Sequence, residues 1–301
     1  MVCVSTTRKC KDTLDRLMVI LLTNDDGYQA EGLVVLESVL QRFGHEVWVC
    51  APSDQRSAQS HAMTLRGKVK IVRYGQHHYH CSGTPADCIL YGLTGNTLPV
   101  TPDVVISGIN HGYNASTDIL YSGTVGAAKE ASLRGIKAIA ISARVDKSTG
   151  KFPFEKAATF LAEHLVEFLP FCLDDVVLNI NVPPHCTGRW RVGRIGILEY
   201  FDTLEKNVTS KTTMFDAAST KLGLAYGNAD DDELHIGQEM LLSLSEGIIP
   251  GMKDNGMLTD YMILSEGDVS VTPLQVLPAI HEQTFMKLEH MMRASEVPCS
   301  G

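Results

Sequence analysis

The stretch that decides the fold is Val19–Gly27, which reads VILLTNDDG. Its apolar residues do not alternate with polar ones, and such a run is typical of a strand buried on both faces of a parallel sheet. Asp25 and Asp26 are therefore expected in the turn after the strand's carboxyl end, where open α/β sheets bind ligands. Two adjacent carboxylates repel each other, so a bound divalent cation would explain the pair. An ordinary Asp-Gly turn between strand and helix is the alternative.

The composition narrows the class of protein. The 301 residues carry a net charge of -9, which argues against a sequence-independent nucleic-acid binder with its basic stripe. Eight cysteines without a C-x-x-C pair suggest free thiols in a reducing cytoplasm. No run reaches the roughly 18 apolar residues of a membrane span. Residues 1–17 lack an apolar core segment, so we expect a flexible extension and not a secretory signal. A cytoplasmic protein without nucleic-acid or membrane partners is expected.

Apolar runs and helical patterns alternate over residues 18–190. The expected strands are 19–22, 47–51, 68–82, 103–108, 138–142 and 176–181, and the expected helices are 33–43, one that Thr84 caps, 123–134 and 154–169. This alternation predicts an α/β protein with a doubly wound, mostly parallel sheet.

The pattern changes after Trp190. Strand-like pieces at 191–198 and 268–273 are separated by polar, glycine-containing stretches, of which the acidic run 230–233 is interpreted as a solvated loop. We expect a smaller β-rich extension over 191–276, with one strand returning to the core. Residues 277–301 are expected to form a helix, over 278–293, and a tail.

Three further polar loops follow predicted strands on the edge that holds the acidic pair. They contain Asp54, Arg56 and Ser57, then Asn110 and Asn114, and finally residues 121–128 (YSGTVGAA), which open a helix. Unpaired N–H groups at a helix start favour an anion, and Ser122 and Thr124 could add hydroxyl donors. A phosphate there would lie near a cation held by Asp25 and Asp26, as recurs in phosphoryl chemistry. The alternative for residues 121–128 is a serine N-cap whose small residues serve close packing.

The available ligands and the missing motifs restrict the chemistry further. Carboxylate, hydroxyl and amide oxygens suit Mg²⁺, Mn²⁺ or Ca²⁺. The chain lacks H-E-x-x-H, lacks G-x-G-x-x-G after the first strand and lacks G-x-x-x-x-G-K-[ST], so zinc-protease, dinucleotide and P-loop interpretations are disfavoured. The absence of G-x-S-x-G likewise disfavours a serine hydrolase.

Five motifs, in order along the chain, resemble those of the SurE family of survival-protein nucleotidases. They are LLTNDDG (21–27), the Ala-Pro loop ending in Arg-Ser (51–57), GTPADC (83–88), SGIN (107–110) and YSGTVGAA (121–128). NINVP (179–183) and VSVTPL (269–274) extend the resemblance to near residue 275. It implies a metal-dependent phosphatase of nucleoside monophosphates, with a Rossmann-like catalytic domain and a β-rich extension used in dimer or tetramer assembly. It also implies one divalent cation, held by Asp25, Asp26, Ser57 and Asn110.

Two positions depart from the family pattern. The family usually has an aspartate directly after the Ala-Pro pair and a glycine after the metal-site serine. This chain has Ser53 and Ala58 there, with Asp54 one residue later. Ser57 keeps its distance from Ala51, so it stays a predicted ligand, but the departures put the backbone of this loop in doubt.

The predicted function is hydrolysis of nucleoside 5'- and 3'-monophosphates, with Mg²⁺ or Mn²⁺ as the cation. The candidate catalytic residues are Asp25, Asp26, Asn114 and Ser122, and the expected phosphate-binding residues are Asn114, Ser122, Gly123 and Thr124. Attack by water is favoured over an aspartyl-phosphate, because phosphatases with that intermediate place a second acid two positions on, where this chain has Gly27. A preference for polyphosphate or another phosphomonoester, or a non-catalytic nucleotide-binding regulator, are the alternatives.

The extension carries apolar side chains in polar surroundings. They are Phe201, Leu204, Met214, Phe215, Leu222, Leu224, Tyr226, Leu234 and Ile236. Such side chains are buried only against the main domain or against another subunit, because large exposed apolar patches are unusual on monomers. With the resemblance, this predicts a homodimer, which could pair again into a homotetramer.

Overall fold

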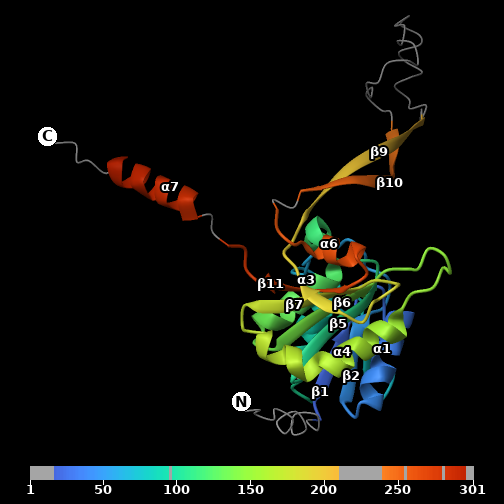
Figure 1. Ribbon diagram of the computed structural model, residues 1–301. Coiled ribbons are helices and arrows are strands. Elements are labelled where there is room, and N and C mark those ends of the chain that lie inside the picture. The colour runs from blue at the N-terminus through green and yellow to red at the C-terminus, as the bar shows by residue number, and fades with distance from the viewer. Residues whose placement is uncertain (1–16, 95–96, 210–238, 254–255, 280–281, 296–301) are drawn as a thin grey trace, which may run out of the picture. The chain divides into compact units, whose positions relative to one another are not determined.

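The computed structural model describes residues 17–94, 97–209, 239–253, 256–279 and 282–295 (Figure 1). The chain forms two compact units, Ile197–Lys253 and the remainder. Nearly all of the predicted N-terminal extension, the acidic run 230–233 and the tail after residue 295 lie outside the described residues. The domain boundaries predicted at residues 17, 190 and 276 stay predictions.

In the described part of the larger unit, nine strands form one sheet in the order β3-β4-β2-β1-β5-β6-β7-β11-β8. These strands are β1 (Val19–Thr23), β2 (Glu46–Pro52), β3 (Ile71–Arg73), β4 (His78–Cys81), β5 (Val104–His111), β6 (Lys137–Ala143), β7 (Val176–Val182), β8 (Trp190–Val192) and β11 (Val269–Gln275). The six strands from β4 to β7 in that order are parallel, whereas β3 pairs antiparallel with β4 and β11 antiparallel with β7. The mostly parallel α/β sheet expected from the sequence is confirmed.

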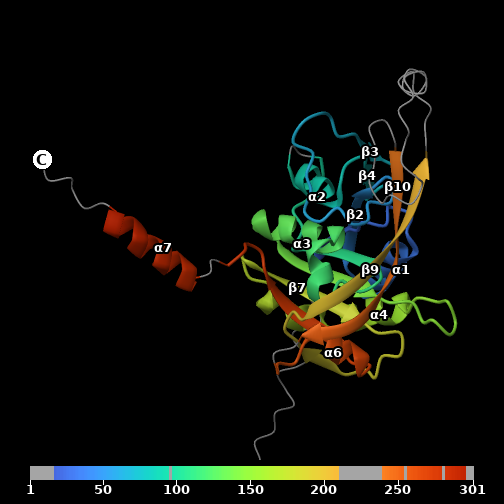
Figure 2. The ribbon, with the colours of Figure 1, turned by 90° about the horizontal axis from the view of Figure 1, so that it is seen from above.

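Helices cover both faces of this sheet (Figure 2). On one face lie α1 (Glu31–Arg42) and α4 (Phe154–Phe168), and on the other lie α2 (Pro85–Leu93) and α3 (Gly123–Leu133). Ile20 and Leu22 of β1 belong to the core under the first pair of helices, and Leu21 to the core under the second. The unbroken apolar run of β1 therefore arises because the strand is buried on both sides.

The strand order reverses at β1. From β1 the chain passes through α1 to β2 and on to β4, then returns to place β5 on the other side of β1. In open α/β sheets, ligands bind outside the carboxyl ends of the strands at such a switch point. The carboxyl ends of β1 and β5 carry the acidic pair and Asn110, so the fold puts them at this position.

The C-terminal part of the larger unit differs from the prediction in two places, one of which is the helix α6 (Asp260–Ser265) within the segment expected to be β-rich. The single strand predicted over 191–198 is wrong, because the chain forms β8, breaks, and starts β9 at Ile197. At the break, Gly193 lies so close to α6 (Asp260–Ser265) that an added Cβ would be 2.8 Å from the backbone nitrogen of Asp260. The strand expected to return to the core is β11, and the C-terminal helix is α7 (Glu282–Ser295).

Among the helices that the structure describes, none combines the length and the hydropathy that a membrane crossing requires. Two short 3-10 turns, η1 (Ser116–Leu120) and η2 (Leu169–Phe171), were not expected from the sequence. The first of them matters for function, since it connects Asn114 to the start of α3.

The smaller unit consists, in its described part, of two long antiparallel strands. They are β9 (Ile197–Thr209) and β10 (Glu239–Lys253), with Thr209 opposite Glu239 and Ile197 opposite Lys253. The apolar side chains to which the sequence assigned the subunit contact lie outside the part of the structure in which side chains are described.

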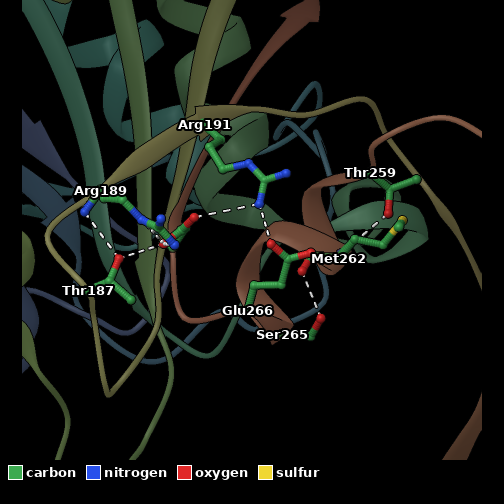
Figure 3. A network of polar contacts seen from close by, with 8 residues as sticks. Thr187, Arg189, Arg191, Thr259, Met262, Ser265 and Glu266 are labelled. Carbon is green, nitrogen blue, oxygen red and sulfur yellow. Dashed lines mark hydrogen bonds and ion pairs between the residues drawn. The ribbon is translucent and has the colours of Figure 1, made fainter.

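A network of charged side chains fixes β8 to the turn between α6 and β11 (Figure 3). Asp268 is fully buried, accepts a hydrogen bond from Thr187 and forms ion pairs with Arg189 (3.1 Å) and Arg191 (3.6 Å). Arg191 also pairs with the more exposed Glu266. The hydrogen bond from Thr187, then the contacts from the two arginines, hold the pKa of Asp268 below its ordinary value.

Replacing Asp268 with Asn is expected to lower the thermal midpoint at neutral pH, because two arginines lose a buried partner. A lowered pKa stabilises the fold above the ordinary aspartate pKa, and this contribution is lost as the pH falls through the folded-state value. The difference between wild type and Asp268→Asn should therefore shrink below about pH 4. Differential scanning calorimetry across pH checks this, with Glu266→Gln as the exposed control of small effect. A pH-independent difference would contradict the explanation.

Candidate active site

The turn after β1 is closed by Asn24 and not by either aspartate. The Asn24 side chain donates to the carbonyl oxygen of Gly27 (2.8 Å) and accepts from the Gly27 N–H (3.2 Å). Gly27 has φ +103°, a conformation that favours glycine. Local turn formation therefore does not require the carboxylates of Asp25 and Asp26, which weakens the interpretation of an ordinary Asp-Gly turn.

Both carboxylates of the acidic pair are nearly excluded from water. Asp25 is 5% exposed, and the side chain of Asp26 is likewise 5% exposed. Burial, with a smaller contribution from the charge of Asp26, raises the pKa of Asp25 to about 6, although a hydrogen bond from Thr124 opposes the shift. Burial also raises the pKa of Asp26, against the opposing effect of His111. Among the described residues, no lysine or arginine forms an ion pair with either carboxylate.

His111 is a site residue to which sequence reasoning assigned no role. Its backbone N–H donates to Asp26 (3.2 Å), and its Nδ1 lies 3.5 Å from an Asp26 oxygen. The ring stacks on Phe152 and Phe154, with centroids 4.9 and 5.2 Å away, and these contacts restrict its orientation. The available signal was its position directly after Asn110 at the end of β5.

The start of α3 packs against Asp25. Ser122 caps the helix by accepting from the Val125 N–H (3.0 Å), and a Cβ on Gly123 would lie 3.0 Å from the Cβ of Asp25. The Thr124 hydroxyl donates to Asp25 (2.6 Å). The predicted anion loop is thus next to the acidic pair, but the Thr124 hydroxyl is already engaged by a carboxylate.

Asn114 is held by asparagines from β7. Its backbone N–H donates to Asn181 (2.9 Å), and its carbonyl oxygen accepts from Asn179 (2.7 Å) and Asn181 (3.1 Å). Its side-chain Nδ2 donates to Ser142 of β6 (2.9 Å), which leaves the second hydrogen of that nitrogen for a ligand. In the sequence, this interaction is indicated only by Asn179 and Asn181, two polar residues in the otherwise apolar strand β7.

Asn110 and Ser57, the two neutral residues among the predicted metal ligands, are placed differently. Asn110 donates through Nδ2 to the Gly112 carbonyl oxygen (3.1 Å), so its side-chain oxygen is left for a cation. Ser57 lies on an exposed loop and accepts from Gln55 (3.2 Å). That loop is joined to the acidic turn by the hydrogen bond from the Arg56 N–H to the Asp25 carbonyl oxygen (2.7 Å). The fold therefore brings Asp25, Asp26 and Asn110 to the switch point, and attaches the loop of Ser57 to them.

The rest of that loop is anchored to α2 and α3. Asp87, fully buried in the capping box of α2, accepts from the backbone (2.9 Å) and the hydroxyl (2.6 Å) of Thr64. Gly126 leaves room for the loop, since a Cβ there would lie 2.4 Å from the carbonyl oxygen of Ser60. Ala58 has φ +57°, so this chain keeps at that position a conformation that the glycine usual in the family would favour.

The donors present fit a hard divalent cation. Among the described residues, no group of three or more His, Cys, Asp or Glu side chains could hold a metal ion, so a site here depends on neutral oxygens beside two carboxylates. Carboxylate, hydroxyl and amide oxygens are ligands that Mg²⁺ accepts, together with water. A cation would also offset the repulsion and desolvation that raise the pKa values of Asp25 and Asp26.

The fold and the site together define a doubly wound α/β protein with two carboxylates next to a helix N-terminus, at the switch point of its sheet. The family model described as "Survival protein SurE" matches residues 20–201. This chain belongs to the SurE family.

Named relatives agree with this assignment. A protein of Pseudothermotoga lettingae named 5'-nucleotidase SurE is 33% identical over 284 residues, covering 93% of this chain and 96% of the relative. A protein of the same name from Desulfitobacterium hafniense is 36% identical over 256 residues, covering 83% and 95%. The crystal structure of the SurE protein from Aquifex aeolicus superposes with a TM-score of 0.69 at 27% identity, covering 91% of this chain and 99% of that one.

Replacing Asp25 with Asn is expected to stabilise the protein when EDTA keeps it free of metal. A pKa raised from 3.8 to about 6 means that the carboxylate destabilises the fold above that value and has no such effect below the unfolded-state pKa. Removing the charge should therefore add about 3 kcal/mol to the free energy of unfolding at pH 8 and little at pH 4. Urea denaturation at the two pH values measures this. Equal stability of both proteins at pH 8 would show that the pair is not under electrostatic strain.

Proposed function

We propose that this protein is a cytoplasmic, metal-dependent phosphomonoesterase that hydrolyses nucleoside 5'- and 3'-monophosphates. The observation that carries the proposal is the pair Asp25 and Asp26, whose carboxylates are nearly excluded from water, with Asp25 against the start of α3 at the switch point of a SurE-family fold. The relatives named 5'-nucleotidase SurE support the nucleotide substrate and the hydrolytic reaction.

The phosphate is assigned to the start of α3 and to Asn114. The N–H group of Gly123 belongs to the first turn of the helix, where backbone donors and the helix dipole favour an anion. The hydroxyl of Ser122 and the second Nδ2 hydrogen of Asn114 provide two further hydrogen-bond donors, one from each residue. Thr124 contributes chiefly by orienting Asp25, through its hydroxyl.

Asp25, Asp26, Asn110 and Ser57 are the proposed ligands of one Mg²⁺ or Mn²⁺ ion. When bound, such a cation supplies polarisation of the phosphoryl oxygens and neutralisation of charge in the transition state. The hydrogen bond from the Arg56 N–H to the Asp25 carbonyl oxygen ties the Ser57 loop to Asp25, and the parallel pairing of β1 with β5 places Asn110 at the same edge of the sheet.

Proton movement is assigned to Asp26 and His111. The Nδ1 of His111 lies 3.5 Å from an Asp26 oxygen, a separation that one bridging water would span. Asp26 would accept the proton of the attacking water, and His111 would return a proton to the departing nucleoside oxygen. Water is the proposed nucleophile, since position 27, which carries a second acid in phosphatases with an aspartyl-phosphate, is a glycine here.

The protein is expected to release phosphate from nucleoside monophosphates in the presence of Mn²⁺ or Mg²⁺ and to stop, reversibly, when EDTA is added. Asp26→Asn should lose at least about 100-fold in kcat/KM, because interaction with the cation is worth several kcal/mol. Asp103→Asn, at the amino end of β5, is the control, with unchanged activity expected. Colorimetric phosphate release from a panel of monophosphates and polyphosphate measures both variants. Activity that survives EDTA, or near wild-type turnover by Asp26→Asn, would falsify the proposal.

We also propose that the smaller unit mediates assembly into a homodimer, which can pair into a homotetramer. A two-stranded sheet is marginally stable in water, and β9 and β10 are 13 and 15 residues long. Contact with a second copy would cover such strands in a symmetric interface.

Static light scattering at micromolar concentration is expected to give a mass of two or four chains. A version in which residues 200–250 are replaced by a short Gly-Ser linker should scatter as a monomer, since it lacks the strands that make the contact. If the full-length protein is monomeric while it releases phosphate, the proposal for assembly is wrong and the one for catalysis stands.

A further inference from the structure

A second hollow lies beside the candidate phosphate site, at the carboxyl ends of β6 and β7. It has a volume of about 560 Å³, within the ~300–1,000 Å³ usual for small-molecule pockets. Its wall includes Tyr113, Arg144, Lys147, His185, Tyr261 and Leu264. None of these residues takes part in holding the cation or the phosphate as proposed above.

Several residues that line the hollow are close in sequence to Asn114 or to the residues that hold it. Tyr113 precedes Asn114 in the chain, and Arg144 lies two residues after Ser142, which accepts from the Asn114 side chain. Pro183, a further wall residue, lies two residues after Asn181, which bonds the Asn114 backbone. The hollow therefore lies next to the residues that position Asn114, which makes it the candidate site for the part of a substrate that is not phosphate.

A buried carboxylate fixes the opposite wall. Asp260, at the start of α6, accepts from the N–H and the hydroxyl of Ser116, each at 2.7 Å. Ser116 stands two residues after Asn114 and has φ +55°, so this backbone conformation is held by the pair of hydrogen bonds. Since α6 supplies Tyr261 and Leu264 to the hollow, the wall keeps a defined position relative to Asn114.

The chemistry of the wall favours a flat, uncharged ring system with hydroxyl groups. The Arg144 guanidinium lies 5.4 Å from the ring centre of Tyr113, and such a pair offers a stacking surface. Leu264 and Pro183 provide apolar contact on other sides. Asp146, at the rim, accepts from Ser148 (2.9 Å from N–H) and lies 3.6 Å from His185, which leaves a carboxylate that can accept from hydroxyl groups.

A polyphosphate chain fits this wall poorly. Arg144 and Lys147 would attract it, but part of its charge would be desolvated against Leu264, Pro183 and two tyrosine rings, which offer less compensation than water does. The Asp146 carboxylate would also repel it, because hydrogen bonds from Ser148 hold the pKa of Asp146 below its ordinary value.

We propose that the hollow lined by Tyr113, Arg144 and Tyr261 binds the nucleoside part of the substrate, with the base packed against the Tyr113–Arg144 pair and the ribose near Asp146. This inference rests on the proposed nucleotidase function and assigns the part of the protein that distinguishes nucleotides from other phosphomonoesters.

Adenosine, which lacks phosphate, is the probe, and isothermal titration calorimetry on the full-length protein with Mn²⁺ is the measurement. Adenosine is expected to bind the wild type and to inhibit AMP hydrolysis competitively. Tyr113→Leu should weaken binding at least 10-fold, whereas Tyr113→Phe, which keeps the ring, should bind within about 2-fold of wild type. Ser265→Trp, which adds bulk at an exposed wall position, should weaken binding as strongly as Tyr113→Leu. Lys151→Met, in the same loop but outside the wall, should bind like wild type.

The outcomes separate this inference from the function on which it rests. If AMP is hydrolysed but adenosine binding is equal in Tyr113→Leu and Tyr113→Phe, the nucleoside does not occupy the hollow and the nucleotidase proposal stands. If tripolyphosphate, and not adenosine, binds in a manner that Arg144→Met abolishes, the hollow is an anion site and the inference is overturned. If no monophosphate is hydrolysed but adenosine still binds Tyr113→Phe like wild type and Tyr113→Leu at least 10-fold more weakly, the nucleoside site is supported and the catalytic proposal fails.

Discussion

Two carboxylates on consecutive residues, both nearly excluded from water, raise the free energy of the folded protein unless the surroundings offset their charge. Little in the surroundings offsets the charge of Asp25 and Asp26. The hydroxyl of Thr124 donates a hydrogen bond to Asp25, and His111 lies beside Asp26, but no lysine or arginine among the described residues pairs with either carboxylate. The turn itself does not need them, since Asn24 closes it. The fold thus holds a concentrated negative charge in place, and a divalent cation is the partner that fits it best.

The surrounding elements keep this charge beside the start of α3, the proposed anion site. β1 and β5 end at the same edge because they are parallel neighbours, and α3 can begin against Asp25 because position 123 is a glycine. Asn179 and Asn181 position Asn114, while Asp260 holds Ser116 on the other side of it. The negative charge of Asp25 and the backbone donors at the start of α3 are thus placed side by side, although they come from distant parts of the chain.

Several of the residues named from the sequence meet in the structure, although not always in the expected role. Thr124 was expected to donate to phosphate, yet its hydroxyl donates to Asp25 because the helix start packs directly on that carboxylate. Ser57 reaches the site through the backbone of its loop, and Ala58 retains a left-handed conformation despite the missing glycine. His111 could not be assigned from the sequence, because its contact with Asp26 joins residues 85 positions apart.

The sequence by itself determined the α/β class, the buried first strand, the acidic turn and the helix that opens with small residues. These are local properties, since apolar runs, turn residues and caps act over a few neighbouring positions. The tertiary structure alone decided that β8 and β9 are separate strands, that asparagines of β7 hold Asn114, and that α6 lines a hollow next to the proposed phosphate site. Such features depend on contacts between segments 65 to 144 residues apart. A local sequence pattern does not indicate which distant side chain will form the contact.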